Sequence, residues 1–175
     1  LPLMLAHENT ILKSAACATA VSNGFAEIVA KRNGLTVYTV SHGYDADATE
    51  GPYPAGNDIF NIVYTGGLVL GNPDFRPLLD AIGNLIERNQ IDKKDIRVEF
   101  FGGGNERSIA NIFHNHKYAE LIVNYGAVSR SDAIRRQRGA ALLLLASHPG
   151  INGWITSKMF EYFVPFRPVI SIQKE

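Results

Sequence analysis

The stretch Ala140-Ala-Leu-Leu-Leu-Leu-Ala146 is the longest apolar run in this sequence of 175 residues. It is far shorter than the roughly 20 apolar residues that a helix needs to cross a bilayer, and it has the length of a strand. Residues 141–145 lack the apolar–polar alternation of a strand with one face in water. Such a strand is typical of a parallel sheet that helices cover on both faces.

Strand and helix patterns alternate around this run. Strands are expected over 59–65, 96–101, 121–125, 141–145 and 168–172, and helices over 77–88, 106–118, 131–138 and 156–163. Five strands alternating with four helices predict an α/β domain with a doubly wound parallel sheet. The first three strands are followed by Gly66-Gly67, Gly102-Gly-Gly104 and Gly126. Because such sheets bind ligands beyond the carboxyl ends of their strands, we expect a ligand site at this edge.

The first 45 residues carry a shorter version of the same pattern. Helices are expected over 5–16 and 25–32, and strands over 17–21 and 35–40. Ser22-Asn23 supplies an N-cap for the second helix, and Gly34 follows its last turn. We therefore divide the chain into an opening part (1–45), a loop-like linker rich in acids, prolines and glycines (46–58), and a main α/β domain (59–175). The start at Leu1, and the lack of a helix after the last strand, lead us to expect a truncated piece of a longer protein.

Composition narrows the class of protein. The formal net charge is +0, from 17 basic and 17 acidic side chains. A general nucleic-acid binder needs a basic excess, so we expect no nucleic-acid partner. Hydrophobic residues make up 46% of the chain, which is enough for a core. The single cysteine, Cys17, is expected to be buried and inert, in keeping with a reducing compartment and a cytoplasmic location.

The segment Thr156-Ser-Lys-Met-Phe-Glu-Tyr-Phe163 predicts a capped helix start with two charged residues. Lys158 and Glu161 are three residues apart, so they share a helix face. The free N–H groups of a helix start favour anions, and a carboxylate beside them can accept the hydroxyls of a ribose. An ordinary surface ion pair, which contributes little to stability, is the alternative interpretation of the same two residues.

Two common phosphate-binding motifs do not fit the glycines. Gly66 and Gly71 have the spacing of a P-loop, but Asn72-Pro73 stands where Lys and Ser or Thr are required. Neither Gly66-Gly-Leu-Val-Leu-Gly71 nor Phe101-Gly-Gly-Gly-Asn105 matches the dinucleotide fingerprint G-x-G-x-x-G. The sequence therefore disfavours P-loop and NAD-binding proteins.

The order of segments resembles the C-terminal half of a retaining glycosyltransferase of the GT-B type, in the large family that includes many bacterial polysaccharide and lipopolysaccharide sugar transferases. The segments that carry the resemblance are Val63-Tyr-Thr-Gly-Gly67 with Pro77-Leu-Leu-Asp-Ala81, Val98-Glu-Phe-Phe-Gly102, Tyr125-Gly-Ala-Val128, and Ser157-Lys-Met-Phe-Glu-Tyr162 with Arg167-Pro-Val-Ile170. Ala20-Val-Ser22 and Val40-Ser-His-Gly-Tyr-Asp45 resemble the end of the family's N-terminal domain. The resemblance implies a Rossmann-like donor-binding domain.

The resemblance also implies roles for single residues. Glu161 corresponds to the carboxylate that accepts both ribose hydroxyls of a nucleoside-diphosphate sugar. The backbone at Thr156 and Ser157 corresponds to the diphosphate-binding helix start, where Lys158 adds a positive charge. Lys158 and Glu161 are thus the expected catalytic residues. The other residues expected to contact the donor are the glycines of the strand ends, Gly66, Gly67 and Gly102, and the base-side residues Val128 and Arg130.

Three positions depart from the family pattern. Gly153 stands where the family often has a second acid, eight residues before Glu161. Gly67, and Gly71 or Asn72, stand where it often has basic residues, for which Arg76 or Arg130 are candidate substitutes. These departures leave two alternatives open: a GT-B sugar-nucleotide epimerase, and a degenerate glycosyltransferase-like domain that serves in assembly.

By resemblance, the whole protein is expected to transfer a sugar from a nucleoside diphosphate to an acceptor hydroxyl with retention, in cell-surface polysaccharide or lipopolysaccharide synthesis. The partners are then the nucleotide-sugar donor and a saccharide or lipid-linked acceptor held mainly by the N-terminal domain. No metal and no further cofactor are expected, and this piece is expected to bind donor without turnover.

The four arginines 130, 135, 136 and 138 are expected to form a solvated face, with contact to the inner face of a membrane left open. His114 and His116 are expected at the surface.

Overall fold

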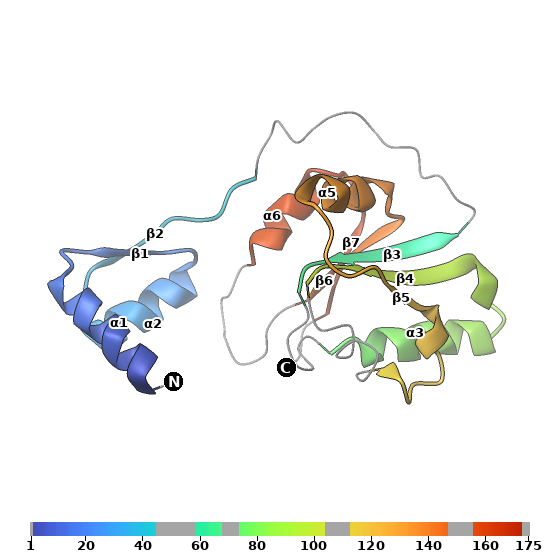
Figure 1. Cartoon of the computed structure of the whole chain (residues 1–175), viewed down its shortest axis with the longest axis horizontal. Coiled ribbons are helices and arrows are strands. Elements are labelled where there is room, and N and C mark those ends of the chain that lie inside the picture. The colour runs from blue at the N-terminus through green and yellow to red at the C-terminus, as the bar shows by residue number, and fades with distance from the viewer. Residues whose placement is uncertain (1, 45–58, 68–73, 104–112, 147–155, 173–175) are drawn as a thin grey trace. The chain divides into compact units, whose positions relative to one another are not determined.

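The computed structural model describes residues 2–44, 59–67, 74–103, 113–146 and 156–172 (Figure 1). The chain divides into two compact units, the first made of residues 1–44 and 150–160 and the second of residues 45–149 and 161–175. The predicted linker at 46–58 lies outside the described residues.

The described residues 2–44 of the first unit contain two helices and two short parallel strands. In chain order they are α1 (Pro2–Ser14), β1 (Ala18–Ala20), α2 (Asn23–Asn33) and β2 (Val37–Thr39). The Ser22 hydroxyl accepts a hydrogen bond from the Phe25 N–H at 3.3 Å, and Gly34 adopts φ 63° after the last turn of α2. Both predicted caps are therefore confirmed. Cys17 lies between α1 and β1, outside either element, and is exposed, so the prediction of a buried thiol is wrong.

The second unit is built on a parallel sheet with the strand order β5-β4-β3-β6-β7 among the residues described. Its strands are β3 (Phe60–Thr65), β4 (Ile96–Phe101), β5 (Ile122–Asn124), β6 (Leu142–Ala146) and β7 (Val169–Ile172). Within the described residues, the helices of this unit include α3 (Arg76–Glu87), α5 (Arg130–Gly139) and the end of α6 (Ser157–Phe163). Figure 1 shows α3 on one face of the sheet and α5 with α6 on the other. The predicted α/β doubly wound parallel sheet is confirmed.

Each face of the sheet has its own apolar core. Alternate residues of a strand point to opposite faces, so Ile62 and Tyr64 of β3 pack on the side of α3, and Val63 packs on the other. The larger core adds Leu78, Leu79 and Ile82 from α3. The smaller core contains Val63, Phe101, Ala140, Leu143 and Tyr162. The continuous apolar run in β6 is thus explained by burial on both faces.

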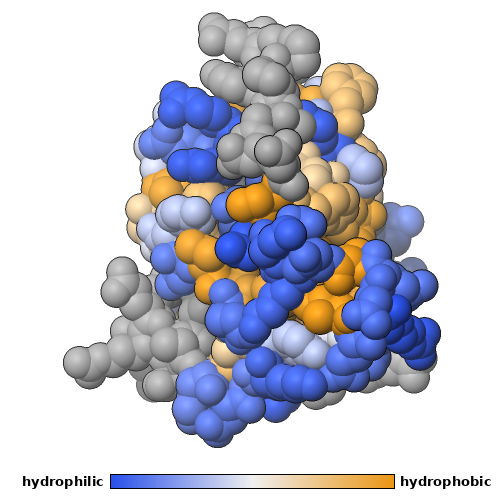
Figure 2. All heavy atoms as spheres, turned by 90° about the vertical axis from the view of Figure 1, so that its right-hand side faces the viewer, coloured by the Kyte–Doolittle hydropathy of each residue, from blue (hydrophilic) through white to orange (hydrophobic). Residues whose placement is uncertain are grey.

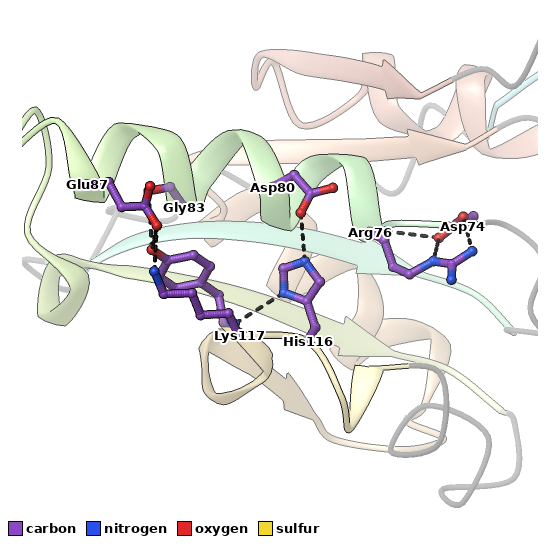
Figure 3. A network of polar contacts seen from close by, with 8 residues as sticks. Asp74, Arg76, Asp80, Gly83, Glu87, His116 and Lys117 are labelled. Atoms are coloured by element: carbon purple, nitrogen blue, oxygen red, sulfur yellow. Dashed lines mark hydrogen bonds and ion pairs between the residues drawn. The ribbon is translucent and has the colours of Figure 1, made fainter.

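The helix predicted over 106–118 ends earlier than expected. In the described part of this range only Phe113 is helical, residues 114–118 form turns, and a short 3-10 helix, η3 (Ala119–Leu121), follows. The turns bring two side chains to α3 (Figure 3): His116 Nε2 lies 3.0 Å from Asp80 Oδ1, and the Tyr118 hydroxyl donates to Glu87 Oε1 at 2.9 Å. The His116 side chain is only 14% exposed, so the prediction of a surface histidine is wrong at this position.

The end of the sheet where β4 begins is exposed and polar. The preceding 3-10 helix, η2 (Lys93–Asp95), is exposed, and Lys94 Nζ lies 3.1 Å from Asp92 Oδ2. Figure 2 views the molecule from this side, and hydrophilic residues there separate several smaller apolar areas. Glycines follow β3, β4 and β5 at the opposite end of the sheet.

Glycines allow the chain to approach itself closely at the carboxyl ends of β3, β4 and β5. The Gly66 N–H donates to the Phe101 carbonyl and the Gly102 N–H to the Gly126 carbonyl, both at 2.7 Å, which continues the hydrogen bonding beyond the strands. A Cβ atom on Gly102 would overlap the Gly66 carbonyl, whereas one on Gly103 would meet no atom within 4 Å. The sheet geometry therefore requires glycine at position 102.

We predict that Gly102→Ala lowers the free energy of unfolding by about 1–3 kcal/mol, because the added methyl group would force two backbone segments apart. The neighbouring substitution Gly103→Ala is the matched control, expected to change it by less than about 0.5 kcal/mol. Urea unfolding followed by circular dichroism measures both values. Equal effects of the two substitutions would contradict this explanation of Gly102.

A second close approach joins α3 to the turn at 114–118. A Cβ atom on Gly83 would overlap the Tyr118 ring, whereas one on Gly139, the last residue of α5, would meet nothing within 4 Å. We predict that Gly83→Ala destabilises the protein by about 1–3 kcal/mol. Gly139→Ala is expected to stabilise it by up to about 1 kcal/mol through the unfolded state. Thermal unfolding tests both, and a Gly83→Ala protein as stable as the original would rule out tight packing here.

Candidate functional site

A buried polar network joins α5 and α6 to the carboxyl end of β3. The Thr65 N–H donates to the Tyr162 hydroxyl at 3.1 Å, and the Thr65 hydroxyl oxygen lies 3.3 Å from the Tyr162 hydroxyl oxygen. Gln137 Nε2 donates to the same Thr65 hydroxyl at 2.8 Å. Tyr162 is 1% exposed, and burial raises the pKa of its phenol, so the hydroxyl stays protonated. The residue that follows Thr65 is Gly66, so the network lies directly beside the glycine-bearing edge.

Glu161 is exposed, while its neighbour Tyr162 is buried against the sheet. Successive residues of a helix point about 100° apart, so anchoring Tyr162 inward turns the Glu161 side chain toward solvent. This carboxylate thus lies next to a fixed point of the sheet edge and is open to a ligand. The predicted position of the ribose-binding acid is compatible with this geometry.

The start of α6 carries three further residues predicted to bind the donor. The Thr156 hydroxyl oxygen accepts a hydrogen bond from the Lys158 N–H at 3.3 Å, so the predicted cap is present. Ser157 is exposed and Lys158 is partly buried. Residues 156–158 belong to the first unit, and Glu161 to the second. Because the cap occupies the Lys158 N–H, a diphosphate at this turn would depend more on the lysine ammonium.

The Tyr125 ring, just after β5, stacks on the Phe101 ring at the end of β4, with centroids 4.6 Å apart and planes at 3°. The Arg136 guanidinium lies over both rings, 5.2 Å from the Phe101 centroid and 5.5 Å from that of Tyr125. The Tyr125 hydroxyl donates to Glu99 Oε1 at 3.3 Å, and burial together with this carboxylate raises the pKa of Tyr125. These contacts fix the beginning of the segment that leads from β5 to α5.

The two residues predicted beside a nucleobase lie in or directly after this segment. Val128 is 37% exposed, and Arg130 is the exposed first residue of α5. The N-cap of α5 is Ser129, whose hydroxyl oxygen accepts from the Asp132 N–H at 3.1 Å. The stacked rings of Phe101 and Tyr125 precede Val128, and the capped start of α5 follows it, so Val128 and Arg130 lie between two fixed contacts and are both exposed.

The four arginines of this region do not form one solvated face. Arg138 is 6% exposed, and its carbonyl accepts from Arg167 Nε at 2.8 Å. Arg136 covers two rings, and Arg135 pairs with Asp132 at 2.9 Å. The prediction of a solvated face is therefore wrong for Arg138, since its place on the inner side of α5 buries it. Membrane contact stays a prediction; among the helices described, none has the length and apolar character to cross a bilayer.

One candidate substitute for the missing basic residues has another partner. Arg76 donates from Nε to Asp74 Oδ1 at 2.9 Å, and its Nη2 lies 2.7 Å from Asp74 Oδ2, as Figure 3 shows. A guanidinium in this two-point contact is already neutralised by a carboxylate. Arg76 is thus a poor substitute for the missing cations.

The structure brings Gly66, Gly67 and Gly102 together at one edge and connects Glu161 to that edge through Tyr162. Sequence reasoning assigned no role to Thr65, Gln137 or Tyr162. Two features of the sequence could have indicated them. Thr65 is a polar residue at the end of an apolar strand, and Gln137 is a glutamine on the inner side of a helix. Gly71, Asn72 and Gly153 lie outside the described residues. Within the described ranges, no cluster of three or more His, Cys, Asp or Glu side chains could hold a metal ion.

No protein-family model matches this chain, and no curated protein matches it. Solved structures do. The sucrose-phosphate synthase of Thermosynechococcus elongatus superposes with a TM-score of 0.68 at 14% identity, over 98% of this chain and 44% of that one. The UDP-forming α,α-trehalose-phosphate synthase of Burkholderia vietnamiensis gives 0.65 at 10% identity, over 96% and 46%. The pneumococcal O-GlcNAc transferase GtfA, solved with UDP and GlcNAc, gives 0.62 at 12%, over 94% and 31%.

The chain spans less than half the length of each of these three structures. At 10–14% identity the likeness concerns the fold and leaves donor, acceptor and reaction open. The superposition includes nearly all of this chain, in keeping with a resemblance that also covered nearly all of it. The protein has the fold of the GT-B glycosyltransferases.

Proposed function

We propose that this chain is the donor-binding part of a retaining glycosyltransferase, which moves a sugar from a nucleoside diphosphate to an acceptor hydroxyl. The observation that carries the proposal is the exposed Glu161 carboxylate on a helix whose next residue, Tyr162, is fixed to the glycine-bearing sheet edge. The GT-B fold supports the proposal that this carboxylate binds the ribose of a nucleotide-sugar donor.

The proposed roles follow from the chemistry of each group. A carboxylate has two oxygens side by side, which suits the two neighbouring hydroxyls of a ribose. The Lys158 ammonium, a mobile point charge, suits the diphosphate. Gly66, Gly67 and Gly102 let sugar and phosphate approach the backbone, and Val128 and Arg130 lie on the side of the base.

In the proposed reaction the bond from the anomeric carbon to the diphosphate oxygen breaks, and a bond to the acceptor oxygen forms. The acceptor hydroxyl releases its proton to solvent, and the departing diphosphate oxygen keeps the electron pair of the broken bond and so gains negative charge. A cation placed where this charge grows stabilises the transition state, which is the role proposed for Lys158. Retention, a saccharide or lipid-linked acceptor and a part in cell-surface polysaccharide synthesis belong to the proposal on the strength of the family resemblance.

We predict that Glu161→Ala weakens the binding of UDP or GDP about 10- to 100-fold, as expected when a charged hydrogen-bond partner is lost. Isothermal titration calorimetry with both nucleotides measures this effect. Asp95→Ala, which removes an exposed carboxylate at the other end of the sheet, is the control and should leave the dissociation constant unchanged. Equal affinity of the original protein and Glu161→Ala would discard the ribose role.

We predict that Lys158→Ala weakens UDP about tenfold and uridine by less than about twofold, because the ammonium acts on the phosphates. The ratio of the two dissociation constants is the quantity to measure, since general damage to the protein would change both. An unchanged ratio would show that Lys158 has no diphosphate role.

The two alternatives differ in what they predict for binding and products. A degenerate assembly domain would bind UDP and GDP weakly and without preference. A sugar-nucleotide epimerase would bind the nucleotide, but the full-length protein would release an epimerised sugar without any acceptor. A product assay with and without acceptor therefore separates both from a transferase.

A further inference from the structure

We infer that Tyr162 is a positioning residue, whose hydroxyl contact with Thr65 sets the orientation of Glu161 for donor recognition. The inference rests on the proposed function, because it assigns the Glu161 carboxylate to the donor. It adds a residue that has no ligand contact of its own and acts through its neighbour.

The contact lies where two strands of the sheet separate. β3 and β6 pair at Ile62–Leu142 and Val63–Leu143, whereas β3 continues to Thr65. At Thr65 the Tyr162 hydroxyl accepts the backbone N–H, on a strand whose other side remains paired with β4. The hydroxyl therefore takes the place of a strand acceptor and ties α6 into the sheet.

This separation coincides with the reversal of strand order. From β3 the chain runs through β4 to β5 on one side, then returns to β6 and β7 on the other. Doubly wound sheets bind their ligands at the carboxyl ends of the strands beside such a reversal. Tyr162 thus fixes α6 at the place in the sheet where a ligand is expected.

Packing of the ring does not explain why residue 162 is tyrosine and not phenylalanine. The Tyr162 ring lies in an apolar cluster with Val63, Phe101 and Leu143, which a phenylalanine ring would fill equally well. The hydroxyl, in contrast, contacts the backbone N–H and the hydroxyl of Thr65, and Gln137 of α5 donates to the same Thr65 hydroxyl. A polar network that is fully satisfied in a core specifies one arrangement of the elements that it joins.

The anchor acts on Glu161 through the shortness of α6. The helix has seven residues, and a helix of this length is not stable by itself in water, so tertiary contacts set its direction. Glu161 is the residue next to the anchor. Loss of the hydroxyl contact would let the last turns of α6 rotate and would move the carboxylate away from the ribose.

The test compares Tyr162→Phe with Tyr118→Phe, which removes a buried tyrosine hydroxyl that bonds to Glu87 on α3. We expect Tyr162→Phe to raise the dissociation constant for UDP about tenfold, and Tyr118→Phe to leave it unchanged, under conditions where all proteins are folded. Isothermal titration calorimetry gives the constants, and circular dichroism verifies folding.

A double-mutant cycle separates positioning from general stability. If Tyr162 acts through Glu161, then Tyr162→Phe adds no further loss of UDP affinity in a Glu161→Ala background. Additive losses in the double mutant, or equal UDP affinity of Tyr162→Phe and the original protein, would overturn the inference. Should Tyr162→Phe fail to fold, Thr65→Val takes its place in the same cycle, with an expected loss of about threefold.

Failure of the proposed function gives a different result. If the original protein binds neither UDP nor GDP, donor binding is refuted, and amide hydrogen exchange still tests the anchor. Positioning by Tyr162 predicts that Tyr162→Phe, but not Tyr118→Phe, speeds exchange of the α6 amides about tenfold or more. Unchanged exchange in α6 would show that the hydroxyl does not hold the helix.

Discussion

The structure of the second unit depends on how closely β3, β4 and β5 approach one another where they end. Hydrogen bonds from Gly66 to Phe101 and from Gly102 to Gly126 extend the sheet past its last regular residues. A side chain at position 102 would overlap the Gly66 backbone. Backbone contacts thus fix the ends of these three strands relative to one another, and the residues that contact those ends are positioned by them.

A buried hydrogen-bond network connects the end of β3 to α5 and to the end of α6. Thr65 bonds with Tyr162 of α6 and Gln137 of α5. Burying these polar groups would be costly if any lacked a partner, so their mutual bonds favour one arrangement of the two helices. Glu161 is exposed and does not pack in the core, but its position is restricted because it is next to the buried Tyr162.

Local patterns predicted most of the fold, and contacts between distant segments explain what they missed. The strand at 96–101 and the caps at Ser22 and Gly34 agree with the structure because each follows from neighbouring residues. The burial of Arg138 and the turns at 114–118 depend on what α5 and α3 meet in space. The candidate site divides likewise: its glycines were visible in sequence, but the link from Tyr162 to Thr65 spans 97 positions.

The departures from the family pattern have a structural cause at one position. A Cβ atom on Gly67, where the family often has a basic residue, would lie 2.7 Å from the Gly103 carbonyl oxygen. The close approach of the two strand ends therefore excludes a side chain there, so the absence of a cation follows from the construction of this edge. Since Arg76 is held by Asp74, a donor diphosphate would depend on Lys158 or Arg130 for its positive charge.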